Sequence, residues 1–170
     1  MARACGRGRT IAGMSYDALK WLHVLSATLL VGGGFGSAFH LVLATARRQP
    51  ADAAAAARDI LRFDAFVGAP AAVFQLASGA WLLDRLGVAW TTDWVLLSVL
   101  LYALVIAVWV PVVVLESRMR RLAVAAVHPL ASFPRRYWAC FFGWLALGAI
   151  GFGLFAAVFW LMLAKRVPFA

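Results

Sequence analysis

The chain has 170 residues, of which 65% are hydrophobic and only 14% charged, and its formal net charge is +9. Soluble globular domains carry about 25% charged residues, so this composition excludes an ordinary soluble protein. In so apolar a chain, the positive charge indicates contact with anionic lipid at the cytoplasmic face of a membrane, rather than with nucleic acid.

Residues 1–13 form a short basic tail, and we expect a single transmembrane domain to cover residues 14–170. Met14 is an alternative to Met1 as the start of translation. The tail lacks the long apolar region and the small-residue cleavage motif of a secretory signal peptide.

Long runs without a charged residue occur at four places in the chain. Each has at least the roughly 17 residues that a helix needs to cross a hydrocarbon core about 30 Å thick. Backbone polar groups must be satisfied internally in lipid, and the runs lack the alternating pattern of barrel strands. The sequence therefore predicts an all-α integral membrane four-helix bundle, with helices at approximately 17–46, 65–84, 94–116 and 137–164.

The connections between these helices are too short to contain a soluble domain. Residues 51–64 are rich in alanine and carry two arginines one turn apart, so we expect a short helix at the membrane surface that leads into the second membrane helix. In the connection 116–136, we expect Glu116 to be a solvated helix end and His128 to be a solvated loop residue.

Basic residues are distributed unequally between the two ends of the predicted bundle. The connections 47–64 and 116–136 together hold nine arginines. The opposite end holds four basic residues outside the N-terminal tail, namely Lys20, Arg85, Lys165 and Arg166. By the positive-inside rule, both connections lie in the cytoplasm and both termini lie outside, in the bacterial inner membrane.

Small residues recur at a four-residue spacing in the first and last predicted helices. Gly32 and Gly36, supported by Gly33, form one such pair, and Ala149 and Gly153 form another. Residues of this kind let two helix backbones approach closely in lipid. They predict helix packing, within the chain or in a homodimer; room for a flat cofactor against the first helix is the alternative.

His23 is the main candidate for chemistry, because an imidazole within a membrane helix is by default a functional candidate. Lys20 precedes it by three residues and shares its helix face. A carboxylate of Asp84 or Asp93 at a similar depth would receive the imidazole N–H and fix its tautomer, as a haem or metal ligand requires. The alternative is a histidine hydrogen-bonded to a neighbouring helix or to water.

His40 is the second intramembrane histidine and the weaker candidate. It follows His23 by 17 residues, which separates the two by about 25 Å along a helix axis. The two cannot bind one metal ion, and haem b would need a second ligand of another type or from another protomer. Cys5 and Cys140 fall at opposite ends of the predicted bundle, which argues against a zinc or iron–sulfur site.

The sequences YDALKWLHVLSA at 16–27 and GGGFGSAF at 32–39 resemble the opening of a bacterial family. Its members are described only as predicted integral membrane proteins with a domain of unknown function. The resemblance runs from about Met14 to the C-terminus and implies a small four-helix membrane protein. Lys-x-x-His also resembles the start of HemJ-type protoporphyrinogen oxidases and CopD-type copper-resistance proteins. The HemJ resemblance implies that His23 binds haem.

These observations favour an accessory or structural membrane protein without catalysis of its own, partnered by lipid, a second copy or another membrane protein. A b-type haem-binding redox protein that uses His23, and hence a haem-dependent oxidoreductase, is the first alternative. A small transporter or ion pathway is the second. Few polar residues fall inside the predicted helices to support transport, namely Gln75, Ser78, Ser98 and Tyr102.

Overall fold

The computed structural model describes residues 15–127 and 132–165. Within these ranges, four helices are long and apolar enough to cross a membrane, which confirms the predicted all-α membrane bundle. The basic tail 1–13, Met14 and His128 lie outside the described residues.

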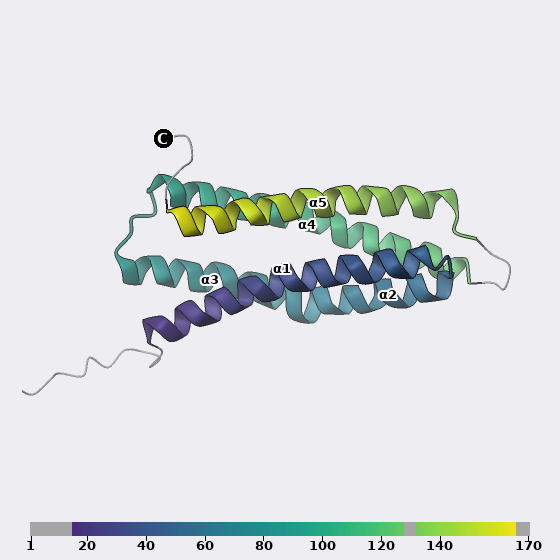
Figure 1. Cartoon of the computed structure of the whole chain (residues 1–170), viewed down its shortest axis with the longest axis horizontal. Helices are drawn as coiled ribbons and strands as arrows, with labels where there is room; N and C mark the ends of the chain where they lie inside the picture. The colour runs from purple at the N-terminus through teal and green to yellow at the C-terminus, as the bar shows by residue number, and fades with distance from the viewer. Residues whose placement is uncertain (1–14, 128–131, 166–170) are drawn as a thin grey trace, which may run out of the picture.

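The chain runs back and forth along the long axis of the bundle (Figure 1). The helices are α1 (Tyr16–Ala46), α2 (Pro50–Phe63), the π-helix η1 (Asp64–Gly68), α3 (Ala69–Leu86), α4 (Asp93–Ala125) and α5 (Arg135–Ala164). We call the end with the α1–α2 turn and the α4–α5 connection the arginine-rich end. It carries Arg47, Arg48, Arg58, Arg62, Arg118, Arg120, Arg121, Arg135 and Arg136. The opposite end, where α1 begins and α5 ends, is the far end.

Local capping signals set several helix boundaries. Ser15 caps α1 by accepting a hydrogen bond from the Ala18 backbone N–H at 3.2 Å. Pro50 opens α2 at a position where its missing N–H is not needed. Gly87 ends α3 in the left-handed conformation, with φ of 63°, which glycine adopts without steric strain.

The second membrane helix begins well before the predicted residue 65. α2, η1 and α3 form one continuous helix of 37 residues from Pro50 to Leu86, so the expected helix at 51–64 is present and leads into the second membrane helix. It is not an isolated surface helix, because one of its faces is buried in the bundle. α2 has an apolar face of Ala53, Ala56, Ala57 and Ile60, which is buried in the bundle. Small side chains on that face let α2 pack closely against α4.

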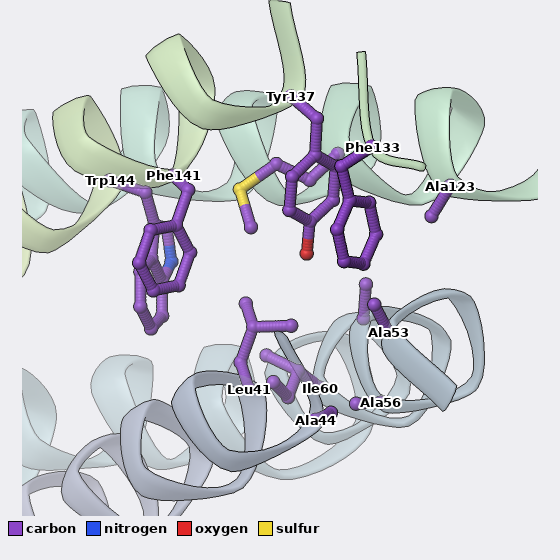
Figure 2. Close-up of a cluster of buried hydrophobic side chains, with 12 residues drawn as sticks. Leu41, Ala44, Ala53, Ala56, Ile60, Ala123, Phe133, Tyr137, Phe141 and Trp144 are labelled. Atoms are coloured by element: carbon purple, nitrogen blue, oxygen red, sulfur yellow. The ribbon is translucent and has the colours of Figure 1, made fainter. Parts of the chain in front are cut away.

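The buried core lies at the arginine-rich end, where α1, α2, α4 and α5 converge. In Figure 2, Leu41 and Ile60 face Tyr137, Phe141 and Trp144 across the interior. A polar contact between Thr45 Oγ1 and the Tyr137 hydroxyl, at 2.8 Å, links α1 to α5 within this core, and both side chains are buried. The core therefore closes this end of the bundle.

Toward the far end, the helices divide into two pairs. α1 packs against α3, and α4 packs against α5 (Figure 1). The helix from Pro50 to Leu86 contacts α4 chiefly through its α2 part. Consequently, the bundle is tightly packed at the arginine-rich end and separates into two halves beyond it.

Candidate functional site

His23 joins α1 to α3 through both of its ring nitrogens. Nδ1 lies 2.8 Å from Ser78 Oγ, and Nε2 lies 2.9 Å from the Gln75 side-chain nitrogen. The Gln75 amide nitrogen can only donate, so Nε2 accepts and Nδ1 donates to Ser78. The Ser78 hydroxyl in turn donates to the Phe74 carbonyl at 2.6 Å. This confirms the alternative in which His23 is hydrogen-bonded to a neighbouring helix.

The same network includes Ser26, and we call Ser26, His23, Gln75 and Ser78 the His23 network. The Ser26 hydroxyl donates to Gln75 Oε1 and is also 3.0 Å from the His23 carbonyl oxygen. Gly79 makes room for the imidazole, because a Cβ atom there would lie only 3.2 Å from His23 Cε1. The network is thus closed on itself and fastens α1 to α3.

The prediction that Asp84 or Asp93 accepts a hydrogen bond from His23 is wrong. Asp84 and Asp93 are exposed, and Ser78 and Gln75 take the positions expected for a carboxylate. Lys20 and His40 are both exposed on α1. Haem ligation by His23 would require one of its hydrogen bonds to be broken, because both ring nitrogens are engaged. In the part of the chain that the structure describes, no three His, Cys, Asp or Glu side chains gather as a metal site.

The glycines of α1 have different surroundings. A Cβ atom at Gly33 would collide with the Phe63 ring, so Gly33 allows a close contact between α1 and the second membrane helix. A Cβ atom at Gly32, Gly36 or Gly153 would meet no atom within 4 Å. Ala149 is exposed. Packing through these four residues therefore remains a prediction that concerns a second copy or another protein.

A cavity of about 370 Å³ lies between the two helix pairs. All four membrane helices contribute to its lining, which is largely apolar. Gly34 and Phe35 of α1, with Gly148 and Phe152 of α5, line the cavity and are also exposed. The Phe35 and Phe152 ring centroids are 6.1 Å apart. The lining therefore reaches the protein surface on the side between α1 and α5, where these two rings meet.

Two carboxyl groups line the part of this cavity nearest the arginine-rich end. They belong to Asp64, the first residue of η1, and to Glu116 of α4. Glu116 is only 3% exposed, and its Oε1 accepts a hydrogen bond from Trp144 Nε1 at 2.8 Å. Its Oε2 is buried and has no hydrogen-bond partner among the described residues. We call Asp64 and Glu116 the carboxyl pair.

The expectation that Glu116 is a solvated helix end is wrong, because α4 continues to Ala125. Glu116 shares a buried helix face with Met119 and Ala123, which contact α2 and α5 in the core. The apolar run therefore ends at Glu116, inside α4, and the first charged residue after it does not mark the end of the helix.

The π-helix positions Asp64 at the cavity. The Ala69 backbone N–H donates to the Asp64 carbonyl five residues earlier, and Pro70 follows without an N–H of its own. Such single π-turns in α-helices are frequently found at functional sites. Nearer the far end, the Tyr102 hydroxyl donates to the Ala72 carbonyl at 2.7 Å and links α4 to α3.

Helical spacing in the sequence indicates that Asp64 of the carboxyl pair lies on the buried side of its helix, although a search for runs without charged residues does not find it. Ala53, Ala57, Ile60 and Asp64 repeat at the three-to-four-residue spacing of one helix face, and that spacing places Asp64 on the buried side. The run of apolar residues before Glu116 conceals the equivalent pattern in α4. No comparable sequence pattern predicts that Gly79 makes room for the His23 imidazole.

The chain belongs to the family described as "Predicted integral membrane protein (DUF2269)", whose model matches residues 17–166. This confirms the resemblance to a family of predicted integral membrane proteins with a domain of unknown function. The resemblance to HemJ-type and CopD-type proteins finds no support in the comparisons. No curated protein and no solved structure matches the chain.

Proposed function

We propose that this member of the family is an accessory membrane protein without catalysis of its own, which holds a lipid-borne molecule between its two helix pairs. The reach of the cavity lining to the protein surface between α1 and α5 carries the proposal. A cavity of about 370 Å³ falls within the range of about 300–1,000 Å³ typical of ligand sites. An opening between α1 and α5 would admit a molecule directly from the bilayer.

The location and partners belong to the same proposal. The arginine-rich end faces the cytoplasm by the positive-inside rule, in the bacterial inner membrane. There its arginines meet anionic lipid headgroups. The exposed small residues Gly32, Gly36, Ala149 and Gly153 would pack against a second copy or another membrane protein.

Two features favour binding over the alternatives of haem chemistry and ion transport. The His23 network engages both imidazole nitrogens, which leaves neither available to iron. The core of Figure 2 fills the arginine-rich end, where an ion pathway across the bundle would have to pass. A site that reaches the surface between α1 and α5 and is closed at one end suits retention of a ligand.

Photolabelling in lipid nanodiscs tests the proposal. A long-chain alcohol that carries a diazirine is activated by light, and the labelled peptides are identified by mass spectrometry. We expect labelling around Tyr102 and Val105 of the cavity that unlabelled alcohol suppresses, because a site saturates and bulk lipid contact does not.

Two glycine variants provide a matched comparison. Gly148 lines the cavity and Gly153 does not, although a Cβ atom at either would meet nothing within 4 Å. Gly148→Leu should abolish the saturable labelling, and Gly153→Leu should preserve it. Labelling that no competitor suppresses, or equal labelling in the two variants, would rule out a ligand site in the cavity.

A further inference from the structure

We propose that the cavity selects a lipophilic organic cation, whose positive charge lies against the carboxyl pair and whose apolar body fills the rest of the cavity. This inference rests on the proposed function and adds the chemical class of the ligand. It depends on three observations, which concern the unpartnered carboxyl oxygen, the absence of competing cations in the lining, and the aromatic walls.

Among the described residues, no basic side chain pairs with the carboxyl pair to compensate a negative charge on it. Glu116 Oε2 is buried and has no hydrogen-bond partner within residues 15–127 and 132–165. The ion pairs in the described ranges involve Asp52 and Asp59 on the exposed side of α2, and none reaches Asp64 or Glu116. A buried carboxylate is unfavourable unless a positive charge or hydrogen-bond donors compensate it. A bound cation would supply this compensation.

No basic side chain competes for that position in the cavity. Its titratable lining residues are Asp64, Tyr102 and Glu116, with no Lys, Arg or His among the described residues that line it. Tyr102 already donates its hydroxyl proton to the Ala72 carbonyl. The arginines closest in sequence to the pair, Arg62 and Arg118, are exposed at the protein surface.

Aromatic and apolar walls favour an organic cation over a metal ion. Phe63, Trp109 and Trp144 line the cavity together with the carboxyl pair. Aromatic faces attract organic cations through the ring quadrupole, most strongly where water is excluded. Ca²⁺ and Mg²⁺ require about six or more oxygen ligands, and the lining offers too few.

The position of the pair defines how such a molecule would lie. Asp64 and Glu116 are at the arginine-rich limit of the cavity, and its lining continues toward the far end through Val105, Tyr102 and Phe155. A cation with one apolar body would therefore place its charge near the membrane surface and its body deeper in the bilayer. Protons compete with cations for carboxylate oxygens, so binding should weaken as the pH falls.

Two ions of matched size and opposite charge provide the test. Binding of radiolabelled tetraphenylphosphonium and tetraphenylborate to the purified full-length protein is measured by equilibrium dialysis, with protein-free micelles as the blank. We expect saturable binding of tetraphenylphosphonium, weaker at lower pH, and no saturable binding of tetraphenylborate. Equal saturable binding of both ions, or no binding of the cation, would overturn the inference.

Substitutions locate the charge that the cation meets. Glu116→Gln keeps an oxygen to accept from Trp144, and Asp64→Asn changes the other carboxyl; each should weaken cation binding by about tenfold or more. Asp59→Asn removes an exposed carboxyl from the preceding helical turn and should leave binding unchanged. If all three variants bind the cation equally well, the carboxyl pair is not the site. If Glu116→Gln does not fold, Asp64→Asn and the comparison of the two ions still test whether the carboxyl pair binds the cation.

The photolabelling experiment separates this inference from the proposed function. Saturable labelling by the uncharged alcohol, without any preference for the cation, would retain a ligand site and reject the cation. Loss of both the saturable labelling and the saturable cation binding would reject the proposed function together with this inference.

Discussion

At the scale of single residues, two groups of polar side chains inside the apolar bundle differ in how completely they are hydrogen-bonded. In the His23 network, the imidazole has a partner at each ring nitrogen. Glu116 instead keeps one buried oxygen without a partner in the described part of the chain. A satisfied network stabilises a packing interface, whereas a buried unsatisfied group costs about 1–3 kcal/mol and calls for a functional explanation.

Breaking the His23 network should loosen α1 from α3. Gln75→Leu removes the partner of His23 Nε2 and of the Ser26 hydroxyl, and we expect a loss of about 1–2 kcal/mol in the free energy of unfolding. Thermal unfolding in detergent measures it. Thr28→Val is the control, because the exposed Thr28 hydroxyl bonds only to the Val24 carbonyl of its own helix. Identical unfolding of the two variants would show that the network contributes no stability.

Removing the charge of Glu116 should stabilise the protein in the absence of ligand. Glu116→Gln keeps the Trp144 hydrogen bond and eliminates a buried carboxylate, so we expect a gain of about 1 kcal/mol, or a rise of roughly 2–4 °C in Tm. Asp59→Asn, at the surface, should leave Tm unchanged. A lower Tm for Glu116→Gln than for the wild type would indicate that the carboxyl group is a structural element instead.

At the scale of elements, hydropathy is enough to locate the membrane helices but not to find their limits or their partners. The predicted bounds of α1 and α5 differ from the structure by one or two residues at most. The alanines and arginines of α2 are typical of an interfacial helix and therefore predict a place at the membrane surface. The spacing of its alanines marks one apolar face, but no local pattern shows that this face is buried against α4. Similarly, the cavity results from how helices pair, so Asp64 and Glu116 read in sequence as boundary markers.

Adjacent glycines in α1 test the packing of that element. Gly33→Ala should lower the free energy of unfolding by about 1–3 kcal/mol, because the added Cβ would collide with Phe63. Gly32→Ala should raise it by up to about 1 kcal/mol, because alanine favours helix and the added Cβ meets open space. Chemical unfolding in mixed micelles measures both. An equal loss in Gly32→Ala would show that Gly32 packs against another protein, such as a second copy.

At the scale of the whole molecule, charge and packing are concentrated at the same end. The arginine-rich end contains the buried core, and the far end consists of two helix pairs. The asymmetry of charge was visible in the sequence, since it depends only on counting arginines. The asymmetry of packing was not, because Ala53, Ala56 and Ala57 acquire their role only where α2 packs against α4 in the core.

The orientation of the molecule can be measured with single cysteines. Cys5 and Cys140 are replaced by Ser, and one cysteine is introduced at Arg48 in the α1–α2 turn or at Ala89 between α3 and α4; both positions are exposed. By the positive-inside rule, we expect an impermeant maleimide to label Ala89→Cys in intact cells and Arg48→Cys only after permeabilisation. The reverse pattern would place the arginine-rich end outside.

The continuous helix from Pro50 to Leu86 has a consequence for biogenesis. α2 carries Asp52, Arg58, Asp59 and Arg62, and charges of this number oppose independent insertion by the translocon. The apolar α3 part supplies the insertion signal, and α2 is positioned as its rigid extension. Because the core at the closed end includes Met119 of α4 and Tyr137, Phe141 and Trp144 of α5, that end can close only after both helices have entered the bilayer.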